Sequence, residues 1–190
     1  MILGSLARQF FCVALLAFAA SAAKAEVLVT YETQGEALFS FSAPDDWQLL
    51  TGFEVAPGDM EAGVTPAPRI VSLLPQEDSE RIMWTGFWAP QGVEDLDTAW
   101  EYLRRVAPRL LEDAEVTFRD QRTINGQDAE VFSGSGIKEG KSVDFAVAAV
   151  QVTASRVAFA AFIGEPEAYD RYEDELVGVL YSMTGVEEGR

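Results

Sequence analysis

The alternation of apolar and polar residues predicts four short strands in the first half of the chain. These segments are Val27–Tyr31, Ala37–Phe41, Ile70–Leu74 and Arg81–Trp88. A period of two places successive side chains on opposite faces of a sheet, so Trp84 and Trp88 share one face of the last strand. Between the second and third strands, Val55–Pro68 is rich in Pro and Gly and predicts a long surface loop.

A helical period replaces this alternation from Asp95 to Leu111. Apolar residues recur there every three or four positions: Leu96, Ala99, Trp100, Leu103, Ala107, Leu110 and Leu111. The spacing predicts an amphipathic helix. Pro108 is expected to kink or split it, because proline removes one backbone hydrogen bond. Two pairs on its polar side are expected to form ion pairs: Glu101 with Arg105, and Arg109 with Asp113.

Two hairpins and a second helix are predicted in the rest of the chain. Val116–Ile124 and Ala129–Ile137 flank Asn125-Gly126, which favours a tight turn because both central residues adopt positive φ. Two later segments, Phe145–Val152 and Val157–Ile163, are apolar on both faces and predict central strands covered on both sides. The second helix begins at Pro166 and ends before Gly185.

This order of elements predicts the α+β class, with helices packed on an antiparallel β-sheet meander in a sandwich. Three parts are expected along the chain: a cleaved signal peptide over 1–25, a single globular α+β domain over 26–185 and a disordered tail over 186–190. No internal repeat or low-complexity segment interrupts the domain.

The first twenty-five residues have the composition of a secretory signal. A basic residue, Arg8, precedes the apolar run Phe10–Ala20, and small residues surround the cleavage sites after Ala25 or, as the alternative, after Ala23. The run is shorter than the roughly 20 apolar residues that cross a bilayer. The sequence therefore predicts a soluble periplasmic protein that is not inserted in the membrane after cleavage, and an uncleaved amphipathic anchor is the remaining alternative.

Acidic residues dominate the chain. Asp and Glu number 31 against 14 Lys and Arg, a formal charge of −17, which becomes −19 when the signal removes two basic residues. Nucleic-acid binding requires Lys and Arg against phosphates, so this class is excluded. A basic protein patch, a metal cation or a basic small molecule fits the charge, and a solvated acidic surface also explains it. The chain has no histidine, and its one cysteine, Cys12, lies in the signal.

One segment, together with the order of the predicted elements around it, resembles a known protein family. Phe39–Trp47 reads Phe-Ser-Phe-Ser-Ala-Pro-Asp-Asp-Trp, and the second helix closes on Tyr181-Ser182-Met183. Together with the aromatic strand before the first helix, the Asn-Gly hairpin and the two apolar strands, this order resembles the PsbP-like superfamily, which includes the extrinsic photosystem II protein and bacterial DcrB-type envelope proteins. The resemblance implies an α/β/α sandwich and a non-enzymatic accessory or binding module. The chain lacks the anchor cysteine of the DcrB type and the histidines of some plant members, so no cofactor or partner is carried over.

Two lysines form a positive spot on this acidic chain. Lys138 and Lys141 are the only lysines after the signal, and they flank a predicted turn. We assign them to partner binding, together with Asp59 and Glu61 in the predicted loop. Ser135–Ser142 differs by one residue from a Walker phosphate loop, but a strand follows it where such a loop requires a helix.

Catalytic motifs are incomplete in this sequence. Ser135 and Lys138 match the Ser-x-x-Lys of penicillin-recognising enzymes, but the companion motifs are missing. Carboxylate clusters near Asp95 and Glu167 have the oxygen ligands that calcium prefers, although acidic residues are also expected at helix starts. We therefore predict no catalytic residue, no metal site and no cofactor.

The sequence favours an exported, non-enzymatic accessory or protein-binding module whose partner is an envelope protein. The alternative is a periplasmic protein that binds a small ligand or cation, through the acidic loop 55–68 or by stacking on the strand with Trp84 and Trp88. The oligomeric state and the identity of the partner are not encoded in any motif.

Overall fold

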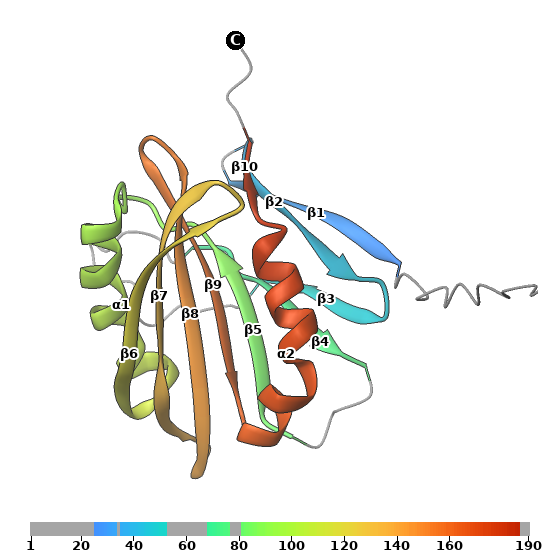
Figure 1. Cartoon of the computed structure of the whole chain (residues 1–190), viewed down its shortest axis with the longest axis vertical. Coiled ribbons are helices and arrows are strands. Elements are labelled where there is room, and N and C mark those ends of the chain that lie inside the picture. The colour runs from blue at the N-terminus through green and yellow to red at the C-terminus, as the bar shows by residue number, and fades with distance from the viewer. Residues whose placement is uncertain (1–24, 34, 53–67, 77–80, 187–190) are drawn as a thin grey trace, which may run out of the picture.

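The structure is a computed structural model that describes residues 25–33, 35–52, 68–76 and 81–186. Within these residues the chain forms ten strands and two helices (Figure 1). The helices are α1 (Leu96–Leu110) and α2 (Pro166–Tyr181). The strands are β1 (Glu26–Thr33), β2 (Glu36–Pro44), β3 (Trp47–Thr51), β4 (Val71–Pro75), β5 (Met83–Trp88), β6 (Glu112–Ile124), β7 (Gln127–Lys138), β8 (Lys141–Thr153), β9 (Arg156–Gly164) and β10 (Thr184–Gly185).

The described strands form two antiparallel sheets. Seven strands pair in the order β3-β4-β5-β9-β8-β7-β6, and three pair in the order β1-β2-β10. The meander from β6 to β9 confirms the two predicted hairpins, and Asn125 and Gly126 have φ values of 47° and 79°. The two strands predicted to be central, β8 and β9, lie in the middle of the large sheet.

Two features of the sheets differ from the sequence prediction. The first two strands form a separate sheet with β10 instead of joining the meander. In addition, Trp47 begins a strand, β3, which pairs with β4 from Trp47↔Pro75 to Thr51↔Val71. Leu49 and Leu50 remain 46% and 42% exposed in β3, so this edge strand has no alternating pattern of burial that the sequence could display.

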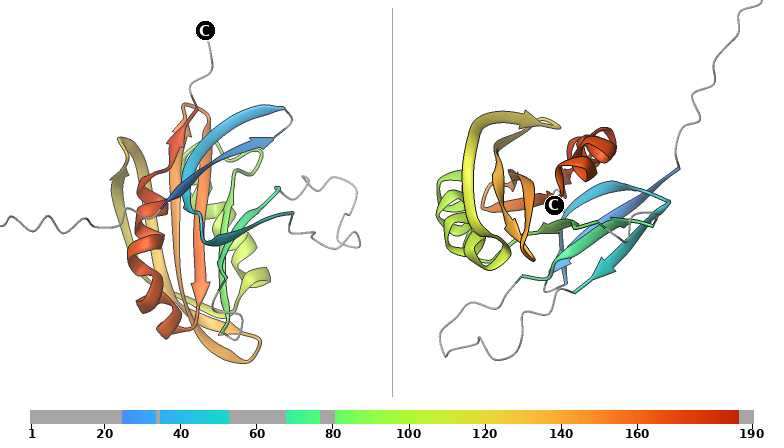
Figure 2. Two further views of the ribbon diagram at one scale, coloured as in Figure 1. Left: turned by 90° about the vertical axis from the view of Figure 1, so that its right-hand side faces the viewer. Right: turned by 90° about the horizontal axis from the view of Figure 1, so that it is seen from below.

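The helices cover opposite faces of the large sheet, as Figure 2 shows. On one face, Trp100 of α1 stacks on Phe132 with ring centroids 5.0 Å apart. On the other face, Tyr169 of α2 contacts Phe162 edge to face. The small sheet lies beside α2, where Phe41 stacks on Phe87 at 4.2 Å. The predicted α/β/α sandwich of the α+β class is therefore confirmed.

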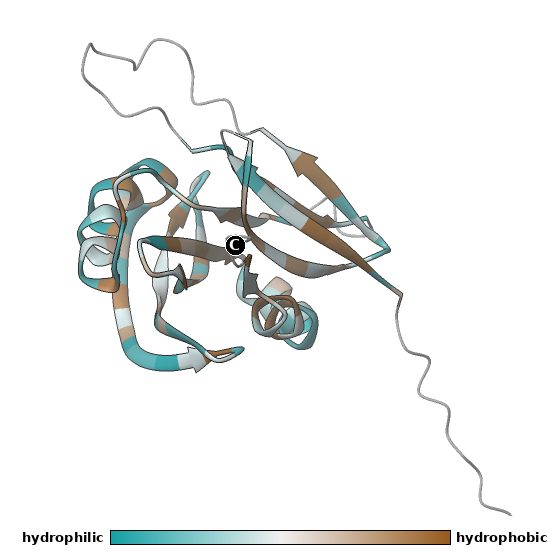
Figure 3. Cartoon of the chain, turned by 90° about the horizontal axis from the view of Figure 1, so that it is seen from above, coloured by the Kyte–Doolittle hydropathy of each residue, from teal (hydrophilic) through white to brown (hydrophobic). Residues whose placement is uncertain are grey.

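Apolar side chains fill the space between these layers, while polar residues cover the outer sides of both helices (Figure 3). The aromatic rings of Tyr31, Phe39 and Phe41 stack in a row within this core. Thr85 is the buried polar link between β4 and β5: its hydroxyl accepts from the Leu73 N–H at 2.9 Å and donates to the Leu73 carbonyl. No helix in the described residues is long and apolar enough to cross a membrane.

The side chain of Asp95 caps the start of helix α1. The Asp95 carboxylate accepts from the Thr98 N–H at 2.8 Å, and this hydrogen bond lowers the pKa of Asp95. Pro108 lies inside α1 but only two residues before its end, so it removes a single helical bond without splitting the helix. The acidic residues near Asp95 thus serve the helix start.

The two ion pairs predicted on α1 are not found among the described residues. Helix α1 ends at Leu110, and Asp113 already belongs to β6 with a φ of 48°, so it no longer follows Arg109 on a helical surface. The Arg105 guanidinium lies over the Tyr102 ring instead, 5.7 Å from its centroid. The spacing of apolar residues predicted the helix correctly, but the charged side chains do not form the two predicted ion pairs.

Candidate functional site

An open groove separates α2 from the start of β1 and the end of β2. Its volume is about 330 Å³. The residues that line it are Glu26, Ser42, Pro44, Asp174, Glu175, Gly178 and Val179. They come from three elements that are far apart in the sequence, and the groove is therefore a product of the tertiary fold.

Hydrogen bonds near the end of α2 hold the two walls of the groove together. The Ser42 backbone N–H donates to Ser182 Oγ at 2.8 Å, and the Ser182 hydroxyl donates to the Val179 carbonyl at 2.6 Å. Trp47 of β3 meets Tyr172 of α2 edge to face, with ring centroids 5.5 Å apart. A Cβ atom added to Gly178 would meet nothing within 4 Å, so the groove is open at this point of α2.

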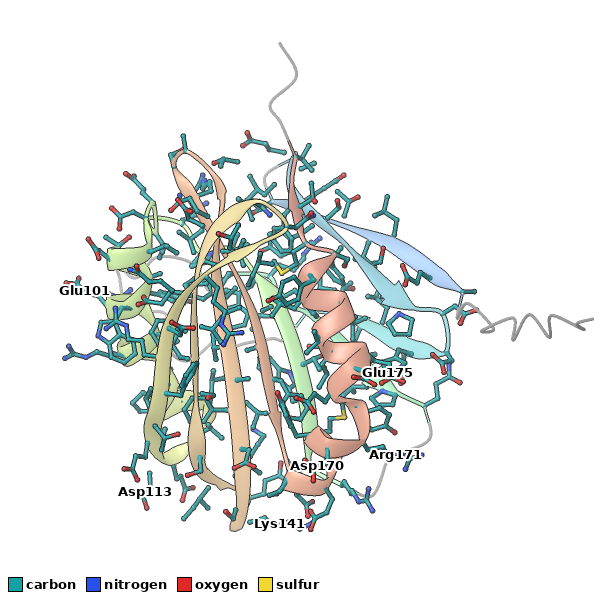
Figure 4. The ribbon with its side chains drawn as sticks, in the orientation of Figure 1. Glu101, Asp113, Lys141, Asp170, Arg171 and Glu175 are labelled. Carbon is teal, nitrogen blue, oxygen red and sulfur yellow. The ribbon has the colours of Figure 1, made fainter. Side chains whose placement is uncertain are left out.

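The charge of the groove is negative. Its lining has three carboxylates, Glu26, Asp174 and Glu175, and no lysine or arginine. Helix α2 carries five carboxylates and one arginine, a formal charge of −4. Figure 4 shows Glu175 and Arg171 on the side of α2 that lies away from α1. The floor is apolar at Pro44 and Val179, so the site can accept both a cation and its aliphatic stem.

The groove carboxylates are not arranged as a metal centre. Across the part of the chain that the structure describes, no group of three or more His, Cys, Asp or Glu side chains is placed to hold a metal ion. Ser42 is the only hydroxyl in the lining, and no basic side chain accompanies it there. The arrangement offers hydrogen-bond acceptors and negative charge to a ligand.

The two lysines of the β7–β8 turn contact their own chain. Lys141 Nζ lies 2.9 Å from Glu165 Oε1, which also accepts from the Ile82 N–H at 2.9 Å. That N–H and then the lysine hold the pKa of Glu165 below its usual value. Lys138 Nζ donates to the Leu110 carbonyl at the end of α1, 3.4 Å away. Both lysines have a structural contact, and their assignment to partner binding stays a prediction.

The two tryptophans of β5 lie on one face, as predicted, but in different surroundings. Trp88 is 2% exposed, stacks on Phe159 at 5.3 Å and donates from Nε1 to the Tyr102 hydroxyl at 3.2 Å. Trp88 therefore belongs to the core, and its burial leaves little access for a ligand to stack on its ring. Trp84 is half-buried, and its buried Nε1 has no hydrogen-bond partner among the residues that the structure describes.

The structure describes only some of the other residues that the sequence singled out. Asp59 and Glu61, with nearly all of the predicted loop 55–68, lie outside the described residues. Ser135 and Lys138 lie three positions apart on the same strand, so their side chains point to opposite faces of the sheet. The Ser-x-x-Lys match therefore does not bring a serine and a lysine together.

The sequence did not single out the groove. Two local signals for it were available in α2: the acidic run Glu173-Asp174-Glu175 and the interior Gly178, which lowers helix stability without serving a turn. Neither signal identifies the opposite wall, because Glu26 and Ser42 approach α2 only in the folded chain.

No protein-family model matches this chain, and no curated protein matches its sequence. Solved structures do match its fold. The cyanobacterial PsbP protein, CyanoP, of Synechocystis sp. PCC 6803 is 11% identical, with a TM-score of 0.57 over 90% of this chain and 99% of that one. LpqN of Mycobacterium tuberculosis, described as involved in cell envelope biogenesis, is 18% identical, with a TM-score of 0.50 over 85% of this chain and 91% of that one. The chain therefore has the PsbP-like fold, which confirms the predicted resemblance.

Proposed function

We propose that this protein is an exported, non-enzymatic accessory module of the bacterial periplasm that binds a basic segment of an envelope protein. The observation that carries the proposal is the acidic groove between α2 and the β1–β2 hairpin. Its lining combines three carboxylates with an apolar floor and contains no cation. This composition complements a segment in which a lysine or arginine lies beside an apolar residue.

The groove recognises its ligand through charge-assisted hydrogen bonds. A lysine or arginine of the partner donates to Glu26 and Asp174, while its methylene stem packs on Pro44 and Val179. A hydrogen bond to a charged group contributes about 1.5–3 kcal/mol, so two of them give a weak to moderate affinity after the cost of association. The negative formal charge, −17 for the full chain and −19 without the predicted signal, also attracts a basic partner over longer distances.

Two further observations support the accessory role. The predicted signal over 1–25 would deliver the protein to the periplasm. One protein with the same fold, LpqN, is described as involved in cell envelope biogenesis. At 18% identity this likeness concerns the fold, and the groove remains the argument for binding.

Crosslinking in the native envelope tests the proposal. The tagged full chain is exported in its own host, crosslinked, purified and identified by mass spectrometry together with any partner. The groove variant is Glu26→Gln with Asp174→Asn. The matched control is Glu32→Gln with Glu36→Gln, which changes the charge equally at the other end of the β1–β2 hairpin, where both residues are exposed.

The proposal predicts a partner in near-stoichiometric amount with the wild type and the control, and its loss with the groove variant. Recovery of the same partner with the groove variant would contradict the proposal. If no partner is recovered, a thermal-shift screen with small organic amines tests the small-ligand alternative, because the groove volume of about 330 Å³ is within the range of ligand pockets. The mass of the purified chain also shows whether the signal has been removed.

A further inference from the structure

Three exposed arginines lie on the outward side of α1: Arg104, Arg105 and Arg109. No ion pair is found for them within the described part of the chain. Three other cations do pair with carboxylates there: Arg119 with Glu130, Arg122 with Asp120, and Lys141 with Glu165. Helix α1 has a formal charge of +1, against −4 for α2. The outward side of α1 is therefore a basic surface on an acidic protein.

The arginines of α1 do not have the spacing that stabilises a helix most. Arg105 and Arg109 are four residues apart, and like charges at that spacing weaken a helix. Glu101 has the spacing to pair with Arg105, yet no ion pair between them is found in the described residues. Glu101, Arg104 and Arg105 instead border a shallow depression of about 370 Å³. The Arg105 guanidinium lies over the Tyr102 ring, and all three arginines are exposed, so their outer N–H groups can still donate to a ligand.

We propose that this surface binds an acidic segment of a protein partner. A guanidinium group presents a planar fork of donors that matches a carboxylate, so adjacent arginines fit successive Asp or Glu side chains. A flat anionic membrane fits less well, because α1 and the start of β6 also expose four carboxylates, Asp97, Glu101, Glu112 and Asp113, which a membrane would repel.

The surface on α1 and the groove beside α2 lie on opposite sides of the large sheet. Figure 4 shows Glu101 of α1 and Glu175 of α2 on opposite sides of the molecule. The two sites have opposite charge, so one copy of the protein can hold an acidic segment and a basic segment at the same time. The arginine surface does not depend on the groove, and each site is tested separately.

Fluorescence anisotropy with a labelled peptide of alternating Glu and Ala tests the arginine surface. The measurement uses the mature protein at about 0.15 M salt, where the Debye length of about 8 Å screens the distant carboxylates but not a direct contact. The test variant is Arg104→Gln with Arg105→Gln. The matched control is Arg69→Gln with Arg156→Gln, which removes two charges elsewhere and for which no ion pair is found in the described residues.

The peptide is expected to bind the wild type and the control equally and the test variant at least about tenfold more weakly. Circular dichroism verifies that all variants are folded. Equal binding by the test variant and the control would overturn the proposal. Stronger binding to phosphatidylglycerol vesicles than to the peptide, lost in the test variant, would also overturn it in favour of a membrane contact.

Discussion

Removal of Arg119 should destabilise the protein strongly, although this arginine lies at the surface. Its Nε and Nη2 atoms donate to the two Glu130 carboxylate oxygens at 2.6 and 3.1 Å. The Glu130 side chain is only 5% exposed, against 45% for Arg119. The guanidinium also lies over the rings of Trp100 and Phe132, 4.9 and 5.4 Å from their centroids. Arg119 therefore fixes β6 to α1 and to a buried carboxylate.

The expected cost of Arg119→Ala follows from that carboxylate. A buried charge that loses its partner costs about 3–5 kcal/mol when both partners are buried. Because Arg119 is half-exposed, solvent reaches part of the vacated space, and we expect about 2–4 kcal/mol. The neutral variant Glu130→Gln keeps an acceptor for Arg119 and should cost about 1–2 kcal/mol.

Urea denaturation followed by tryptophan fluorescence measures these values, and a double-mutant cycle isolates the coupling between the two side chains. The matched control is Arg122→Ala, because the Arg122–Asp120 pair has both side chains nearly half exposed and should contribute little. If Arg119→Ala costs no more than Arg122→Ala, or if the cycle is additive, the account of this buried pair is refuted.

Two further changes have defined expected outcomes. A backbone N–H and the Lys141 ammonium hold the pKa of Glu165 below its usual 4.5, so its contribution to stability is complete above that pH and is lost as the pH falls through the lowered pKa. The acid-side decrease in Tm should therefore be smaller for Glu165→Gln than for the wild type, and parallel curves would argue against this pairing. Gly134→Ala should destabilise the β6–β7 pair by about 2 kcal/mol or more, because the new Cβ would lie 1.8 Å from the Glu115 carbonyl oxygen. Gly178→Ala, in open space on α2, is the control and should stabilise the protein by about 0.5–1 kcal/mol in the same denaturation experiment.

Local signals in the sequence account for most of the fold. The Asn125-Gly126 turn, the helical spacing from Leu96 to Leu110 and the apolar strands β8 and β9 each depend on neighbouring residues, and the structure confirms all of them. The strand β3 was missed because its leucines remain exposed, and it is held by pairing with β4 and by the contact of Trp47 with Tyr172. The separation of β1 and β2 into a second sheet depends on contacts between distant segments, which no local pattern contains.

The candidate sites were less predictable than the fold. Lys138 and Lys141 were singled out because lysine is rare in the chain. Composition does not show that, in the fold, Lys138 donates to the Leu110 carbonyl and Lys141 to the Glu165 carboxylate. Arg105 and Arg109 were expected to form ion pairs from their spacing alone, but Arg105 lies over the Tyr102 ring and the helix ends before Asp113. The groove joins Glu26 to Asp174, and that proximity exists only after folding.

The central claim is that the groove beside α2 binds a basic segment, and an NMR titration tests it most directly. The ¹⁵N-labelled mature protein is titrated with a peptide of alternating Lys and Ala, alongside the variant Glu26→Gln with Asp174→Asn. We predict saturable amide shifts at Ser42, Ala43 and 174–179 in the wild type and their loss in the variant. Shifts of equal size across all acidic surfaces, or unchanged binding by the variant, would contradict the claim.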